Sequence, residues 1–116
     1  MRTYQDIEAD IQTVTEQTAQ LAFMNKEQIY TVVAMLIALS DELNNFMREL
    51  DVKVATAEAK VVADASQTKV TASYLSLLIK QSTAQYKADK EWADRQVNLL
   101  RDLRIAALAA QRSAEN

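Results

Sequence analysis

The stretch that decides the fold is IYTVVAMLIAL, Ile29 to Leu39, the most hydrophobic run in the chain. Charged side chains close it in on both sides: Lys26, Glu27, Asp41 and Glu42. Its eleven residues fall well short of the roughly 20 that a helix needs to cross a bilayer. We therefore expect a buried helical segment, with a role at a membrane surface as the minor alternative.

Composition extends this interpretation to the whole chain, because the 116 residues include no glycine and no proline. Sheets and loop-rich folds use both at their turns, since glycine reaches φ > 0 and proline fixes a corner. Turns here must be formed by Asn, Asp, Ser, Thr and Gln. The composition predicts an all-α fold with few turns and long helices, as a single helical domain over residues 1–116.

The chain also lacks cysteine and histidine, which removes thiol nucleophiles, imidazole bases and the usual ligands of zinc. The acidic cluster Asp89, Glu91 and Asp94 has no histidine beside it and is typical of a solvated helix face. We therefore expect no enzyme, no catalytic residue, no metal site and no cofactor. The absence of cysteine and the acidic, amphipathic N-terminus favour a cytoplasmic protein without a signal peptide.

A first helix is predicted over about residues 3–24. Thr3 and Asp6 have the spacing of a capping box, with Asp in place of the usual Glu or Gln. Apolar positions then alternate at spacings of three and four, as in a coiled-coil seam: Tyr4, Ile7, Ile11, Val14, Thr18 and Leu21. Since an isolated helix of this length is marginal in water, a partner surface is implied.

A second helix is predicted over about 26–65, capped by Asn25 with Gln28 three residues later. Its seam is Val33, Leu36, Ser40, Leu43, Met47, Leu50, Val54, Ala57 and Val61. A third helix is predicted over about 69–112, after a turn in which Asp64, Ser66 and Thr68 can reverse the chain. Its seam is Tyr74, Leu78, Ala88, Trp92, Leu99, Leu103, Ala106 and Ala110, with the apolar residues Leu75, Ala93, Leu100 and Ala107 beside it. The two long helices should form an antiparallel, coiled-coil-like hairpin behind a short N-terminal helix.

The apolar belt over residues 29–47 is wider than one seam, so a hairpin alone would leave much of it exposed. The first helix can cover part of it, and we expect copies of the same chain to cover the rest as a homo-oligomer. The residues assigned to this oligomer interface are Ile29, Val32, Val33, Leu36, Ile37, Leu43 and Met47.

Charge is divided along the chain: residues 1–51 hold nine acids and three bases, and residues 52–116 hold seven acids and ten bases. Basic side chains on the second and third helices form rows that could follow a phosphate backbone. The candidate nucleic-acid-binding residues are Lys53, Lys60, Lys80, Lys87, Lys90, Arg101 and Arg104. The alternative is a basic surface that only keeps the protein in solution. Of the aromatic residues, Tyr86 is expected to be the most available for base stacking, whereas Tyr74 and Trp92 are expected in the core.

Four segments in order resemble the phage recombination-mediator proteins of the UvsY type: MRTYQDIEADI, RELDVKVATAEAKVVADAS, TKVTASYLSLLIKQSTAQY and EWADRQVNLLRDLRIAALAA. The resemblance covers most of the chain. It implies a helical protein that assembles into rings, binds single-stranded DNA and helps load a recombinase onto strands coated by a single-strand-binding protein. In that family a basic pair before the hairpin tip contacts DNA. Here Lys60 matches its second member, Glu58 occupies the first position and Lys53 lies one heptad earlier.

Two functions therefore remain open. The first is an oligomeric recombination accessory protein that binds single-stranded DNA and assists recombinase loading, in the host cytoplasm if the protein is phage-encoded. The second is a non-enzymatic hairpin that binds proteins, such as a phage inhibitor, adaptor or assembly chaperone, without a nucleic-acid role.

Overall fold

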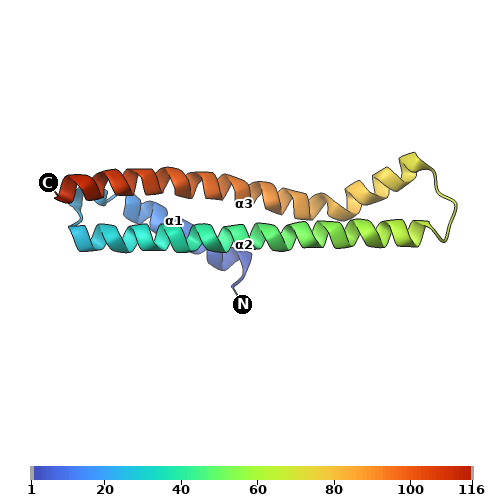
Figure 1. Ribbon diagram of the computed structural model, residues 1–116, viewed down its shortest axis with the longest axis horizontal. Helices are drawn as coiled ribbons and strands as arrows, with labels where there is room; N and C mark the ends of the chain where they lie inside the picture. Colours follow the sequence, from blue (N-terminus) through green and yellow to red (C-terminus); the bar gives the residue numbers. More distant parts are fainter. Residues whose placement is uncertain (1, 116) are drawn as a thin grey trace. The chain divides into compact units, whose positions relative to one another are not determined.

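The computed structural model describes residues 2–115, which form helices and turns without a strand (Figure 1). A short helix α1 (Tyr4–Thr18) is followed by a 3-10 turn η1 (Leu21–Phe23) and two long helices, α2 (Lys26–Ala65) and α3 (Ala72–Glu115). α2 and α3 run antiparallel and pack against each other (Figure 1). The fold is all-α, a short N-terminal helix with a long helical hairpin, as the sequence predicts.

Both predicted capping boxes are present. At the start of α1, the N–H of Asp6 donates to Thr3 Oγ1 (3.3 Å), and the N–H of Thr3 donates to the Asp6 carboxylate (2.9 Å). Before α2, Asn25 and Gln28 exchange the same two bonds, each at 2.9 Å. Each box satisfies two N–H groups that a helix start would leave unpaired.

The helix ends differ from the predicted ones at the end of α1 and at both ends of α3, which runs to Glu115 instead of about residue 112. α1 stops at Thr18 instead of about residue 24, and η1 occupies the last part of the predicted range. α3 begins at Ala72, three residues later than predicted, because Thr71 caps it: the N–H of Tyr74 donates to Thr71 Oγ1 at 3.1 Å. Within residues 2–115 the backbone has no positive φ, so these turns are made without left-handed residues.

The chain divides into two compact units. Unit 1 combines the residues up to Asn44 with those from Asp94 onward, and so contains α1, the first part of α2 and the last part of α3. Unit 2 is Asn45–Ala93, the end of α2, the connecting loop and the beginning of α3.

Unit 1 is a three-helix packing with a complete apolar core. Three side chains of the predicted α1 seam, Ile7, Ile11 and Val14, are buried, which confirms that seam. The buried partners on the other two helices are Ile29, Val32, Leu36, Leu39, Leu43, Leu100 and Ala107. The first helix, α1, was expected to need a partner surface, and it packs against α2 and α3 of its own chain.

This core contains part of the apolar belt to which the oligomer interface was assigned. Four of the seven assigned residues, Ile29, Val32, Leu36 and Leu43, are buried inside unit 1 of a single chain. Val33 and Met47 are half-buried and Ile37 is exposed. Part of the belt is covered because α1 and α3 both pack on α2, while Tyr30 and Ile37 stay exposed.

The buried line of α3 also differs from its predicted seam. Ala93, Leu100 and Ala107 are fully buried and one heptad apart. The predicted positions Leu99 and Ala106, each one residue earlier, are exposed. One residue turns a helix by about 100°, so the α3 core is centred on the apolar residues beside the predicted seam. Alanine at two of the three positions permits close helix approach.

Arg2 ties the start of α1 to α2 within unit 1. Its Nε donates to both carboxylate oxygens of Glu42, at 2.9 and 2.6 Å, and its terminal nitrogen pairs with Asp10. These two carboxylates raise the pKa of the Arg2 guanidinium above its ordinary value. The side chains are substantially exposed, so this clamp orients α1 more than it stabilises the core.

Across residues 2–115, none of the helices combines the length and the apolar character that a membrane crossing requires.

Candidate nucleic-acid interface

Unit 2 is a two-helix hairpin with a thin interior. Its fully buried side chains include Leu50, Thr83 and Ala93. Two helices can cover only one face of each other, so most apolar side chains here keep part of their surface in water. Five of the seven candidate DNA-binding residues lie in this unit, all of them exposed: Lys53, Lys60, Lys80, Lys87 and Lys90.

An ion pair identifies one edge of this hairpin. Lys90 Nζ on α3 lies 2.5 Å from Asp51 Oδ1 on α2, and both side chains are largely exposed. Lys80 and Lys87 project within about 80° of Lys90 around α3, at roughly 100° per residue. These three lysines therefore share one side of the hairpin, which we call the Lys90 edge.

Lys53 and Lys60 lie on the other side. Around α2 they project roughly 160–180° from Asp51, the residue that reaches the Lys90 edge. We call their side the Lys60 edge. The sequence-predicted lysines are thus brought into one unit, but they form two rows on opposite edges of the hairpin.

The remaining two candidates, Arg101 and Arg104, belong to unit 1. Arg101 is exposed and donates to the side-chain oxygen of Asn98 at 2.8 Å, while Arg104 is half-buried. The structure therefore does not place them in the same unit as the lysines.

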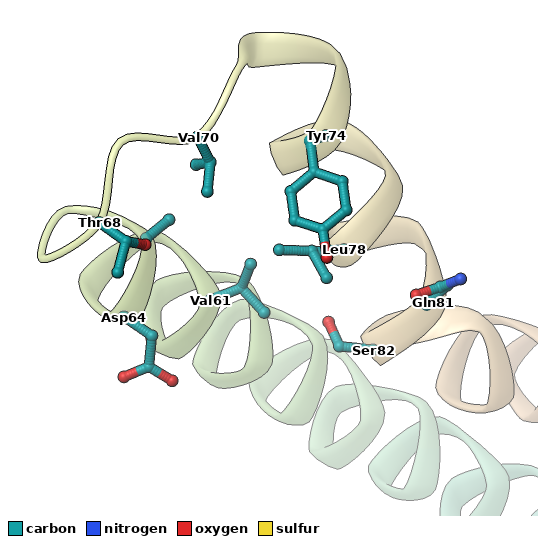
Figure 2. A pocket seen from close by; sticks show the side chains of 9 residues that line it. Val61, Asp64, Thr68, Val70, Tyr74, Leu78, Gln81 and Ser82 are labelled. Atoms are coloured by element: carbon teal, nitrogen blue, oxygen red, sulfur yellow. The ribbon is translucent and has the colours of Figure 1, made fainter.

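A cleft of about 500 Å³ lies at the tip of unit 2 (Figure 2). Apolar side chains from both helices and the loop form most of its walls, with hydroxyl, amide and carboxylate groups among them. The lining residues are Val61, Asp64, Ala65, Thr68, Val70, Tyr74, Leu78, Gln81 and Ser82. Tyr74 and Gln81 project roughly 160–180° from Lys90 around α3, so the cleft belongs to the Lys60 edge.

The cleft exists because the first turns of α3 run away from the end of α2 (Figure 1). Ser82 and Thr83 both donate their hydroxyl hydrogens to the carbonyl of Ile79, at 3.1 and 2.8 Å. Such bonds to the preceding turn bend helices. Thr83 is fully buried, so α3 regains contact with α2 just after this bend.

The aromatic prediction for this region is reversed. Tyr74, expected in the core, is 51 % exposed and forms one wall of the cleft, whereas Tyr86, expected to be the most available for stacking, is half-buried. A signal existed in the sequence: Tyr74 is the third residue after Thr71, the N-cap, and so belongs to the first turn of α3. Side chains in a first turn extend toward the preceding loop, which here forms the other side of the cleft.

Among residues 2–115, no three His, Cys, Asp or Glu side chains are grouped so that they could hold a metal ion. Comparison with protein-family models, curated proteins and solved structures finds no match to this chain.

Proposed function

We propose that the protein is a non-enzymatic, single-stranded-DNA-binding accessory of recombination, which acts as a homo-oligomer and assists recombinase loading. The observation that carries this proposal is the division of charge between the units. Unit 1 contains ten acidic and six basic residues, whereas unit 2 contains six acidic and seven basic residues. Unit 1 therefore repels a polyanion more strongly than unit 2, where basic residues outnumber acidic ones.

Both lysine rows are spaced so that they can follow the phosphates of a bound strand. Neighbouring lysines in the pairs Lys53–Lys60 and Lys80–Lys87 are one heptad apart, or about 10 Å along the helix. Each lysine that neutralises a phosphate releases counterions, so modest rows gain affinity from several phosphates together. Lys80 and Lys87 also border a shallow hollow with Ser76, Ile79 and Ala84, which leaves room for a backbone beside them.

The test is a salt titration of binding to a fluorescently labelled single-stranded oligonucleotide. The wild type should bind at low salt, with affinity falling as salt rises. Lys53→Glu with Lys60→Glu should reduce the slope of log K against log salt by roughly 1.4 if both lysines contact phosphates. Lys80→Glu with Lys87→Glu changes the charge equally and serves as the matched comparison for the other edge. A wild type that does not bind at low salt contradicts the proposal.

The oligomer is supported by two exposed stripes in unit 1. On α2, the acidic stripe has exposed side chains at heptad spacing: Glu27, Tyr30, Ala34, Ile37 and Asp41. On α3, the basic stripe also has exposed side chains at heptad spacing: Arg101, Ile105, Leu108 and Arg112. Each stripe has apolar side chains in the middle and a charged residue at each end. The charged residues are acidic on α2 and basic on α3. One copy's acidic stripe therefore fits another copy's basic stripe.

The second candidate function, a protein-binding hairpin without a nucleic-acid role, is favoured by exposed apolar side chains in unit 2. Val52, Val62 and Leu77 are between 48 and 66 % exposed, and these apolar side chains are available for contact with a partner protein. This candidate, a phage inhibitor, adaptor or assembly chaperone, predicts that the oligonucleotide titration fails while Val52→Ser or Leu77→Ser weakens binding of a partner protein.

A further inference from the structure

We propose that the cleft at the tip of unit 2 receives one unstacked nucleobase of the bound strand, with the base lying against the ring of Tyr74. This inference rests on the proposed single-stranded-DNA function and assigns a subsite to it. The neighbouring phosphates would lie along Lys60 and Lys53 on the same edge.

The shape and lining of the cleft support a flat, partly polar occupant. Its volume of about 500 Å³ lies within the usual range of small-molecule sites, roughly 300–1,000 Å³. Figure 2 shows the ring of Tyr74 reaching from the first turn of α3 toward Val61 and Leu78, with Val70 on the loop side. Apolar walls around an aromatic ring accept the face of a base, which is how single-stranded nucleic acids are commonly held.

Hydrogen-bonding groups are available for the edge of the base. The side chains of Thr68, Gln81 and Ser82 line the same cleft. Gln81 carries both donors and an acceptor, and the hydroxyl groups can do either, so these groups can adapt to any of the four bases. The cleft is therefore expected to bind any of the four bases without a preference for one.

The backbone holds the tyrosine in this position before any strand arrives. Thr71 caps the first turn of α3, and the hydroxyl bonds of Ser82 and Thr83 to Ile79 accompany the bend that keeps this turn away from α2. A ring that is already exposed needs little rearrangement on binding, which limits the entropy cost of ordering it.

The charge beside the cleft fits a strand that enters from the Lys60 edge. Lys60 lies one helical turn before the cleft residue Asp64 and on the same side of α2, and Lys53 lies one heptad earlier. Asp64 also lines the cleft, and its carboxylate points away from the ring of Tyr74 in Figure 2, so it does not occupy the face of the ring on which a base would stack.

The experiment uses the full chain and a labelled single-stranded oligonucleotide containing 2-aminopurine, whose emission reports stacking. Tyr74→Leu keeps apolar bulk in the cleft but removes the ring, and should weaken binding about tenfold while leaving the salt slope unchanged. Tyr74→Phe should bind like the wild type, because stacking does not need the hydroxyl group. A strand with abasic sites in place of bases should bind wild type and Tyr74→Leu equally.

The matched control is Leu77→Ala, an exposed apolar truncation on the same helix outside the cleft lining, which should leave binding unchanged. If the wild type binds the oligonucleotide but Tyr74→Leu and Tyr74→Ala, folded by circular dichroism, bind equally well, the base subsite is wrong and the DNA-binding function stands. If the wild type fails to bind at low salt, the function itself is lost and the subsite with it.

Discussion

Among single residues, Asp6 provides the best defined electrostatic contribution to stability. Its carboxylate accepts the N–H of Thr3, and this bond, together with its position near Arg2, lowers the pKa of the Asp6 carboxyl below its ordinary value of about 3.8. Because the folded pKa is depressed, the contribution is fully present above pH 3.8 and is lost as the pH falls through the folded pKa. Asp6→Asn should therefore lower the melting temperature at pH 7, and the difference from wild type should shrink below pH 4.

Thermal unfolding followed by circular dichroism at pH 7, 5 and 3 measures this difference. Glu8→Gln, an exposed carboxylate on the same helix outside the capping box, is the control. A difference in melting temperature between Asp6→Asn and wild type that stays constant from pH 7 to pH 3 would contradict the stabilising role of the Asp6 carboxylate.

Adjacent residues on α2 test where the core of unit 1 lies. Leu36 is fully buried, while Ile37 is 43 % exposed, although both were assigned to the same oligomer interface. Leu36→Ala should lower the free energy of unfolding by about 2–5 kcal/mol, because it leaves a cavity in a packed core. Ile37→Ala should lower the free energy of unfolding by less than half as much. Urea unfolding measures both, and equal losses would show that the three-helix core is misassigned.

At the level of elements, the register of α3 has a direct test in two neighbouring alanines. Ala107 is fully buried and Ala106, the predicted seam position, is exposed. Ala107→Leu should destabilise the protein by about 1–3 kcal/mol, since the added methylene groups force the helices apart. Ala106→Leu should change stability by no more than about 0.5 kcal/mol. Chemical denaturation compares the two, and the reverse order would restore the predicted seam.

The same elements show which features a sequence can predict. The α1 seam and both capping boxes follow local rules, so Ile7, Thr3 and Asn25 could be assigned from their spacing alone. The face of α3 could not, because alanine carries little hydrophobic signal and Leu99 and Leu100 are equally apolar. Only packing against the other helices distinguishes them.

The candidate site also has features that the sequence could predict and features that it could not. Residue type was enough to predict that the lysines are exposed. Their separation onto two edges could not be predicted, because it depends on which face of each helix the hairpin buries. The role of Tyr74 was missed because its exposure depends on the cap at Thr71 and on the first turns of α3 running away from α2 (Figure 1), and neither follows from a heptad pattern.

At the level of the whole molecule, a single chain covers part of its apolar belt, so the proposed self-association is expected to use the residues that stay exposed. The acidic stripe of α2 and the basic stripe of α3 remain, with Ile37 43 % and Ile105 61 % exposed. Wild type should therefore form oligomers without DNA. Arg101→Glu with Arg112→Glu should give mainly monomers, because two acidic stripes would then face each other. Glu27→Arg with Asp41→Arg should do the same with two basic stripes.

Mixing these two variants should restore assembly, because each acidic stripe again meets a basic one. Light scattering after size-exclusion chromatography measures the mass of each variant and of the mixture. Lys53→Glu with Lys60→Glu, an equal charge change in unit 2, should keep the wild-type mass. Exposed charge pairs contribute up to about 1 kcal/mol each, so reversing two pairs should weaken association by roughly tenfold or more. A wild type that stays monomeric, or a mixture that does not reassemble, would leave these stripes for a partner protein of different sequence.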